Sequence, residues 1–244
     1  MPCELSIVVP VFNEADNVLP LAREVAAAMA GESRSWELVL VDDCSSDDTW
    51  KRIAAAHEAD GRVRGLRLER NSGQSAAVWT GFTATSSPLL ATLDGDLQND
   101  PADLPRLLAE LETCDFVSGW RANRRDMWLR RVSSRIARAA RRGVLGVDVV
   151  DSGCALRVFR RECLDGLFGF NGLHRFLPIL VQGGGLRCKE VPVNHRPRVA
   201  GVSKYGVWNR VWRGIADLFA IAWFQRRRVR RVKFSETPAS RASS

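Results

Sequence analysis

The chain has 244 residues, of which 45% are hydrophobic and 26% charged, and its formal net charge is +8. That length suits one large α/β domain with a substantial core rather than two domains, and no linker or internal repeat divides it. The six cysteines are scattered without a Cys-x-x-Cys pair, so we expect reduced thiols in a cytosolic protein. The first residues lack the basic-then-apolar pattern of a signal peptide, which also favours the cytosol.

The positive charge is concentrated in two segments. Residues 121–142 contain nine arginines and one aspartate, and residues 226–233 contain six basic residues. Because the whole chain carries only +8, the rest of the molecule is acidic. Two basic patches on an acidic body predict anionic partners at two places, with phosphates as the first candidates.

Strand-like and helix-like patterns alternate through the first half of the chain. Short apolar runs predict strands at residues 4–12, 36–42, 63–68, 89–93 and 116–120. Helical periodicity predicts helices at residues 16–30, 47–59, 73–85 and 102–111, with Asn13 and Ser46 as N-caps. This alternation is typical of right-handed β-α-β crossovers, so we expect an α/β fold with a mostly parallel sheet flanked by helices.

Beyond Trp120 the pattern changes. Residues 127–144 predict a basic helix with one apolar stripe, because Leu129, Val132 and Ile136 recur at helical spacing. A strand at 155–159, a helix around 174–181 and a strand at 186–195 complete the globular part that we predict. The predicted domain therefore covers residues 1–206.

The segment that follows, residues 207–234, has the features of a membrane-interface element. Its predicted helix at 207–224 carries Trp208, Trp212 and Trp223, and the basic run at 226–233 follows. Its apolar part is too short to cross a bilayer, which needs roughly 20 apolar residues. We expect an amphipathic helix in an anionic membrane surface; the alternative is a helix packed on the domain with a solvated basic tail. The composition of residues 235–244 predicts a disordered tail.

The most informative motif is the turn that follows the predicted strand at 89–93. Asp94 and Asp96 flank Gly95 at the carboxyl end of that strand, which is where parallel sheets bind ligands. Two carboxylates can converge on one Mg²⁺ or Mn²⁺, Gln98 can add a neutral oxygen, and the glycine lets the backbone approach a phosphate. The alternative is an Asp-Gly turn ahead of a helix that begins at Asp100.

Acidic residues also follow the first two predicted strands. Glu14 follows the first strand, and Asp42 and Asp43 follow the second. Acidic side chains at strand ends commonly bind the ribose or base of a nucleotide, so we expect Asp42 or Asp43 to do so. Helix capping is the alternative for both clusters.

In their order along the chain, these motifs resemble those of the family 2 inverting glycosyltransferases of GT-A fold. Within that family the resemblance is closest to the polyprenyl-phosphate (dolichol-phosphate) hexosyltransferases. The residues that carry the resemblance are 9–14, 41–43, 71–74, 94–98, 119–121, 151–153, 195–196 and 201–206. The resemblance thus implies a Rossmann-like GT-A catalytic domain over residues 1–206.

The resemblance also implies roles for individual residues at the donor. Asp94, Asp96 and Gln98 match the positions that hold the metal on the donor diphosphate. The positions that match the nucleotide site are Pro10, Phe12, Glu14 and Asp42. The family usually has tyrosine where Phe12 stands, so a hydroxyl contact is lost there while stacking is retained.

Two further groups match positions that handle phosphate. Arg121, Arg130 and Ser134 match residues that hold the acceptor phosphate, and Arg130 and Ser134 share a helix face because they are four residues apart. Arg196 and Lys204 match basic residues on a loop that closes over the donor and neutralises the leaving group. His174 and Arg175 also resemble a family position near the site, although a lone histidine at a helix start is more often structural.

The predicted function is inverting transfer of a hexose-type sugar from GDP-mannose or a UDP-sugar to a polyprenyl phosphate, with Mg²⁺ or Mn²⁺ as cofactor. The acceptor is already an anion, so alignment and a metal at the leaving diphosphate suffice without a strong base. We expect a peripheral protein on the cytosolic, inner face of the cell membrane, with an integral membrane partner as the other route to the lipid. One alternative is a transferase of the same fold with a soluble or polysaccharide acceptor. The other is a basic module that binds nucleic acid, and the ordered carboxylate turns argue against this second alternative.

Overall fold

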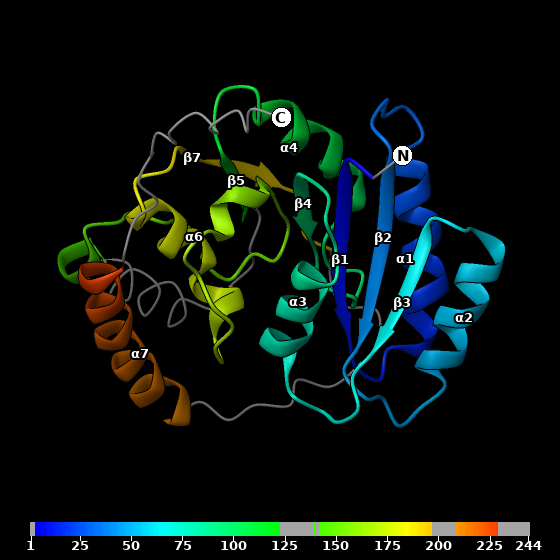
Figure 1. Ribbon diagram of the computed structural model, residues 1–244, viewed down its shortest axis with the longest axis horizontal. Coiled ribbons are helices and arrows are strands. Elements are labelled where there is room, and N and C mark those ends of the chain that lie inside the picture. Colours follow the sequence, from blue (N-terminus) through cyan, green and yellow to red (C-terminus); the bar gives the residue numbers. More distant parts are fainter. Residues whose placement is uncertain (1–2, 123–138, 140–141, 197–207, 229–244) are drawn as a thin grey trace, which may run out of the picture.

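The computed structural model describes residues 3–122, 139, 142–196 and 208–228, and a seven-stranded sheet forms its centre (Figure 1). The strands are β1 (Leu5–Val11), β2 (Trp36–Asp42), β3 (Val63–Arg67), β4 (Leu89–Thr92), β5 (Phe116–Arg121), β6 (Arg157–Arg160) and β7 (Cys188–Val193). The helices are α1 (Ala15–Ala28), α2 (Thr49–Ala59), α3 (Gln74–Thr83), α4 (Leu104–Glu110), α6 (Leu173–Gly183) and α7 (Trp208–Arg227). Two 3-10 turns, η1 (Pro101–Asp103) and η2 (Arg161–Leu164), precede α4 and follow β6.

The strand order is β3-β2-β1-β4-β6-β5-β7. Strands β1 to β4 pair in parallel, as do β5 and β7, whereas β6 runs antiparallel between β4 and β5. The predicted α/β class with a mostly parallel sheet is therefore confirmed. The insertion of β6 places Arg157 beside Thr92, the last residue of β4.

Both faces of the sheet are buried, which explains the continuous apolar runs of its strands. In β1, Ile7 and Val9 belong to an apolar cluster with residues of α1, α2 and α4. Val8 points to the other face and packs in a second cluster with Phe82 of α3 and Leu177 of α6. Side chains alternate along a strand, so this single strand supports both helical layers.

Some predicted boundaries and caps differ from the structure. The predicted caps are wrong, because Glu14 and Asp48 occupy the N-cap positions of α1 and α2 without side-chain cap hydrogen bonds. Asn13 and Ser46 instead bind each other: Asn13 Oδ1 accepts a hydrogen bond from the Ser46 backbone N–H at 2.9 Å. The domain boundary at 206, the disordered tail and nearly all of the predicted basic helix fall outside the described residues.

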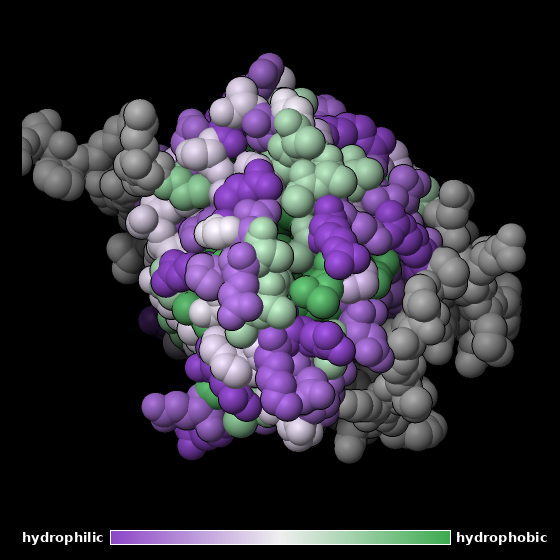
Figure 2. Space-filling model, turned by 90° about the vertical axis from the view of Figure 1, so that its right-hand side faces the viewer, coloured by the Kyte–Doolittle hydropathy of each residue, from purple (hydrophilic) through white to green (hydrophobic). Residues whose placement is uncertain are grey.

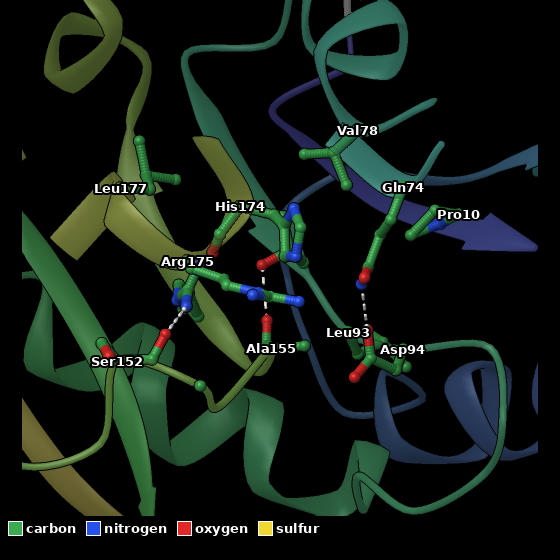
Figure 3. Close-up of a pocket in the computed structure, with 13 residues that line it drawn as sticks. Pro10, Gln74, Val78, Leu93, Asp94, Ser152, Ala155, His174, Arg175 and Leu177 are labelled. Carbon is green, nitrogen blue, oxygen red and sulfur yellow. Dashed lines mark hydrogen bonds between the residues drawn. The ribbon is translucent and has the colours of Figure 1, made fainter. Parts of the chain in front are cut away.

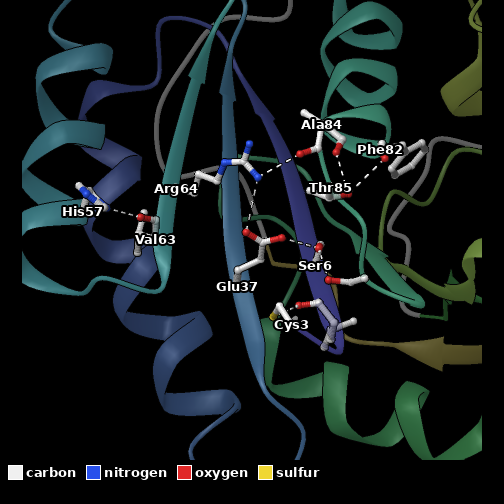
Figure 4. Close-up of polar contacts among 12 residues, drawn as sticks. Cys3, Ser6, Glu37, His57, Val63, Arg64, Phe82, Ala84 and Thr85 are labelled. Carbon is white, nitrogen blue, oxygen red and sulfur yellow. Dashed lines mark hydrogen bonds and ion pairs between the residues drawn. The ribbon is translucent and has the colours of Figure 1, made fainter. Parts of the chain in front are cut away.

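Polar contacts join β1, β2 and β3 near their amino ends (Figure 4). The Ser6 hydroxyl donates to Glu37 Oε1 at 2.6 Å and lies 2.7 Å from the Ser87 hydroxyl. Arg64 Nη1 lies 3.8 Å from Glu37 Oε2 and donates to the Ala84 carbonyl at 3.0 Å. These contacts fix the segment that leads into β4 at the edge of the sheet opposite to the loops described below.

Helix α7 packs on α6 with one face, and two of its described aromatic side chains are exposed. Ile221 and Ala222 are buried, and Gln225 Nε2 donates to the Ile179 carbonyl at 3.2 Å. Phe219 and Trp223 are 63% and 65% exposed. The side of the molecule near α2 and β3 shows hydrophilic residues around a central strip of apolar ones (Figure 2). Within the described part of the chain, no helix is long and apolar enough to cross a membrane.

Candidate active site

The loops that follow β1, β2 and β4 meet at the carboxyl edge of the sheet. Each contains one residue other than glycine in a left-handed backbone conformation: Asn13, Cys44 and Leu97, with φ of 54°, 60° and 60°. Such conformations are costly for bulky residues and cluster at functional sites. These loops are therefore the first place to look for a binding site.

The turn after β4 brings the two predicted metal-binding carboxylates together. Asp94 Oδ1 accepts a hydrogen bond from Gln74 Nε2 at 2.8 Å, and Asp96 Oδ1 accepts one from the Gln98 backbone N–H at 3.2 Å. A side chain at Gly95 would place its Cβ 2.7 Å from Val11 Cγ1. Glycine is needed here because the turn packs against the end of β1. That packing, rather than the predicted approach to a phosphate, is what the structure shows for Gly95.

The electrostatics of this turn suit a divalent cation. Burial and the neighbouring Asp96 raise the pKa of Asp94 to about 6, against the opposing charges of Arg157 and Arg121. A bound cation relieves the repulsion between two carboxylates, and Mg²⁺ is often held by one or two carboxylates together with substrate phosphates and water. Among the described residues no three His, Cys, Asp or Glu side chains form a metal cluster. The protein's charged ligands would therefore be Asp94 and Asp96.

The acidic residues predicted to bind the nucleotide also organise the loops. Asp42 is fully buried; its Oδ1 accepts from the Ser45 backbone N–H at 2.9 Å, and its Oδ2 lies 3.2 Å from Arg67 Nε. Asp43 accepts from the backbone N–H groups of Ser72 and Gly73 at 2.7 and 2.8 Å. Asp43 thus shapes the loop that presents Gln74 at the start of α3, and a direct contact to nucleotide stays a prediction.

The remaining predicted nucleotide residues lie in and after β1. Pro10 lines the pocket described below. Phe12 and Glu14 follow in the loop, where the Glu14 carboxylate accepts a hydrogen bond from Asn17 Nδ2. The Glu14 backbone N–H donates to Thr49 Oγ1 at 2.9 Å. This contact ties the β1 loop to the start of α2.

Arg121, at the end of β5, is held in place by Asp151. Its Nε and Nη2 donate to the two carboxylate oxygens of Asp151 at 2.7 and 2.9 Å, and both side chains are about 85% buried. Although burial acts in the opposite direction, this pair raises the pKa of Arg121 above its usual value. Glu190 of β7 fixes the loop by accepting from the backbone N–H groups of Val150 and Asp151. The guanidinium is therefore positioned before any ligand arrives.

The segment after β7 is attached to the carboxylate turn. The Arg196 backbone N–H donates to the Gln98 carbonyl at 2.9 Å, and His195 forms a β-bridge with Asn99. The Arg196 guanidinium binds Glu24 at 2.6 Å and Asp100 at 2.8 Å, and it does not line the pocket. Its predicted role at the leaving group would require those two pairs to open. The predicted site residues outside the described part of the chain are Arg130, Ser134 and Lys204.

A pocket of about 210 Å³ opens between α3, β4 and α6 (Figure 3). Asp94 and Gln74 lie on one side of it, and His174 and Arg175 project from α6 on the other. Arg157, only 3% exposed, joins its walls by donating to the His174 and Ser152 carbonyls at 2.6 and 3.0 Å. We did not predict Arg157 as a site residue. The sequence feature that could have indicated it is a charged residue within the predicted apolar strand at 155–159.

His174 is held in a defined orientation. Its Nδ1 lies 2.6 Å from the Ser75 hydroxyl oxygen, which also accepts from the Gly172 backbone N–H at 2.9 Å. Burial and the nearby Arg175 and Arg157 lower the pKa of His174 to about 4, so the ring is neutral at neutral pH. We assign to His174 the tautomer in which the Ser75 hydroxyl donates its proton to Nδ1. The Nε2 atom of the neutral ring then carries the proton.

Comparison with known proteins agrees with these observations. The sequence profile of "Glycosyl transferase family 2" matches residues 6–168. Dodecaprenyl-phosphate galacturonate synthase from Rhizobium johnstonii is 42% identical over 236 residues, which are 93% of this chain and 69% of that protein. Undecaprenyl-phosphate 4-deoxy-4-formamido-L-arabinose transferase from Salmonella paratyphi A is 38% identical over 204 residues, 83% of this chain and 62% of that protein. The chain thus spans about two thirds of the length of these relatives.

Solved structures of glucosyl-3-phosphoglycerate synthase from Mycobacterium tuberculosis share the fold. The complex with Mg²⁺ and UDP has a TM-score of 0.67 at 19% identity and covers 91% of this chain and 79% of that one. The complex with Mn²⁺, UDP and glucosyl-3-phosphoglycerate has a TM-score of 0.65, also at 19% identity, and covers 91% and 80%. At this identity the likeness concerns the fold alone, and it confirms the expected GT-A architecture.

Proposed function

The chain belongs to glycosyl transferase family 2, and from that premise we propose that it transfers one sugar from a nucleoside-diphosphate sugar to a polyprenyl phosphate. The observation that carries the proposal is the Asp94–Asp96 turn at the carboxyl end of β4, where Asp94 lines a pocket whose other side carries Arg157 and Arg175. The relatives at 42% and 38% identity are both named for polyprenyl-phosphate products or substrates, which supports the acceptor class. Their names specify different sugars, so the likeness does not choose the sugar.

The donor half of the site would bind Mg²⁺ or Mn²⁺ through Asp94 and Asp96, with Gln98 beside them. When bound, the metal would supply charge stabilisation to the leaving diphosphate. Gln74 fixes one oxygen of Asp94, so the carboxylate is already oriented toward its role. The complexes of the mycobacterial synthase with UDP and Mg²⁺ or Mn²⁺ are consistent with such a donor site.

The acceptor half of the proposed mechanism depends on alignment rather than on a base. A phosphate monoester is already an anion at neutral pH, so it needs only to be held in line behind the anomeric carbon, which inverts on attack. Arg121, fixed by Asp151, is suited to bind that phosphate through its planar guanidinium. Arg130 and Ser134 remain predicted partners. His174 would be a poor base, because its pKa lies near 4.

We further propose that the exposed face of α7 lies on the cytosolic surface of an anionic membrane. Phe219 and Trp223 on this face are both more than 60% exposed, while Arg226 and Arg227 extend from its last turn. Phe168, which is 56% exposed, contacts Phe224 edge-on at a centroid distance of 5.4 Å and continues the apolar surface. Aromatic residues beside arginines are typical of helices at membrane interfaces.

A transfer assay with competing acceptors tests the proposed function. The full chain would be incubated with labelled UDP- and GDP-sugars, a divalent metal, and either undecaprenyl phosphate in detergent or soluble sugar acceptors. We expect label in the organic phase as an inverted, phosphate-linked sugar, and only when the lipid phosphate is present. Transfer to the soluble acceptors alone would instead support a family 2 enzyme of polysaccharide synthesis.

A further inference from the structure

One wall of the pocket consists of hydrogen-bond donors. Arg175 lies at the mouth on α6, and its guanidinium forms no hydrogen bond or ion pair with any described residue. In the tautomer assigned above, Nδ1 of the adjacent His174 accepts from Ser75, and its Nε2–H is free to donate. Arg157 lies behind them. Among the described residues this wall contains no carboxylate.

The negative charges of Asp94 and Asp151 act on Arg157, but Arg157 hydrogen-bonds to neither of them. Both hydrogen bonds of Arg157 are to neutral carbonyl groups, and its buried Nε has no hydrogen-bond partner in the described structure. Arg121, by comparison, has its own carboxylate in Asp151. The one carboxylate among the described lining residues is Asp94, which belongs to the proposed metal turn. Arg157 is buried with an unpaired Nε, and the exposed Arg175 has no ion pair among the described residues, so an anionic ligand could pair with Arg175 without breaking an existing contact.

The position of the wall indicates which part of a donor would reach it. With the diphosphate at Asp94 and Asp96, the sugar is the part that extends into the pocket. The volume of about 210 Å³ is below the roughly 300–1,000 Å³ of pockets that enclose drug-sized ligands, so it suits one monosaccharide better than a nucleotide. Val78 and Leu177 supply apolar lining for a sugar ring, and His174 lies across the pocket from Asp94.

We propose that Arg175 and His174 bind the carboxylate of an acidic donor sugar, which makes nucleoside-diphosphate hexuronates the preferred donor class. This inference rests on the proposed function, because it names the sugar that the same site would transfer. The Arg175 guanidinium pairs with the carboxylate in two parallel hydrogen bonds, and the His174 Nε2–H donates a third. Arg157 holds the wall through the His174 and Ser152 carbonyls and adds positive charge behind it.

A neutral hexose in this position would leave the guanidinium without its anion. Sites built to hydrogen-bond a particular group reject analogues that lack it, because the site's own polar groups are then left unpaired. Loss of a charge-assisted hydrogen bond corresponds to roughly 10- to 100-fold in affinity. We therefore expect a preference of that size for a hexuronate over the hexose that differs only in having CH₂OH for the carboxylate.

The test compares matched pairs of donors with wild-type protein, Arg175→Gln and Arg175→Lys. The pairs are UDP-glucuronate with UDP-glucose and UDP-galacturonate with UDP-galactose, assayed by kcat/KM for the donor and by KM for undecaprenyl phosphate. Equilibrium binding of the corresponding sugar 1-phosphates in the presence of Mn²⁺ provides a readout that depends on neither the base nor turnover. The control is Arg52→Gln, since Arg52 is exposed on α2 and absent from the pocket lining.

We expect wild-type protein and Arg52→Gln to prefer the uronates roughly 10- to 100-fold, Arg175→Gln to lose that preference, and Arg175→Lys to retain part of it. The KM for lipid phosphate should not change. Equal use of neutral and acidic sugars by the wild type would overturn the inference while leaving the proposed transfer intact. A KM for lipid phosphate that is raised in Arg175→Gln with every donor would also overturn it, because Arg175 would then bind the acceptor. Uronate-selective binding without any lipid product would support the inference and count against the proposed function.

Discussion

Gln74 Nε2 donates a hydrogen bond to Asp94 Oδ1 over 2.8 Å, which joins the start of α3 to the turn after β4. Gln74 is itself presented by the loop that Asp43 holds through the backbone N–H groups of Ser72 and Gly73. A chain of contacts therefore runs from the end of β2 to the carboxylate proposed to bind metal. Gln74 acts in this account as a positioning residue.

Replacing Gln74 should weaken metal binding without unfolding the protein. Removal of a group that orients a metal ligand typically costs 10- to 100-fold in affinity, so we expect Gln74→Ala to raise the Mn²⁺ concentration for half-maximal nucleotide binding by roughly 10-fold or more. Titration of Mn²⁺ in the presence of UDP or GDP measures this effect. An unchanged titration would show that the Gln74–Asp94 bond is incidental to the metal site.

A second prediction concerns the pair formed by Arg121 and Asp151. Asp151→Asn keeps the shape of the side chain but removes the charge that fixes the guanidinium. We expect the KM for polyprenyl phosphate to rise roughly 10-fold, with a much smaller change in the KM for the nucleotide sugar. Equal losses for the two substrates would place Arg121 at the donor or in the core instead.

His174 makes a prediction about stability and pH. Its pKa is about 4 in the folded protein against 6.5 in the unfolded chain, so the unfolded state takes up a proton first as the pH falls. The free energy of unfolding should be highest above about pH 6.5 and should decrease toward pH 4, by up to about 1.4 kcal/mol per pH unit. In His174→Asn, the amide oxygen can still accept from Ser75. Between about pH 7 and pH 5, its free energy of unfolding, measured with urea, should decrease less than that of the wild type. Identical pH dependence in both proteins would mean that His174 is not buried as described.

The membrane proposal predicts salt-sensitive binding to anionic vesicles. Each basic residue near such a surface contributes on the order of 1 kcal/mol, and this attraction weakens as salt shortens the Debye length. The protein should co-sediment with anionic but poorly with zwitterionic vesicles, and Phe219→Ser with Trp223→Ser should weaken binding while donor affinity is unchanged. Equal binding to both vesicle types, unaffected by salt or by these changes, would favour a separate integral membrane partner.

Local patterns predicted most of the fold and part of the site. The strand at 36–42 was predicted with its observed bounds. The Asp94–Asp96 turn could be predicted because its two carboxylates directly follow their strand in the sequence. The antiparallel direction of β6 was not predicted, since an apolar run carries no information on direction. The Ser75–His174 bond joins residues 99 positions apart, and such a pair depends on how α3 and α6 pack together. For the same reason, the role of Arg157 between the His174 and Ser152 carbonyls emerged only from the structure.

The central claim is that Asp94 and Asp96 hold the metal. The most direct test compares sugar transfer by Asp96→Asn with transfer by wild-type protein and by Asp48→Asn, a control at an exposed residue. An amide supplies oxygen without charge, so a divalent site built on Asp94 and Asp96 should fail in this variant. We predict that wild-type protein and Asp48→Asn form labelled polyprenyl-phosphate sugar only with Mg²⁺ or Mn²⁺. Asp96→Asn should form none and lose metal-dependent nucleotide binding at an unchanged melting temperature. Wild-type turnover and nucleotide affinity in Asp96→Asn would contradict the assignment of this turn as the metal site.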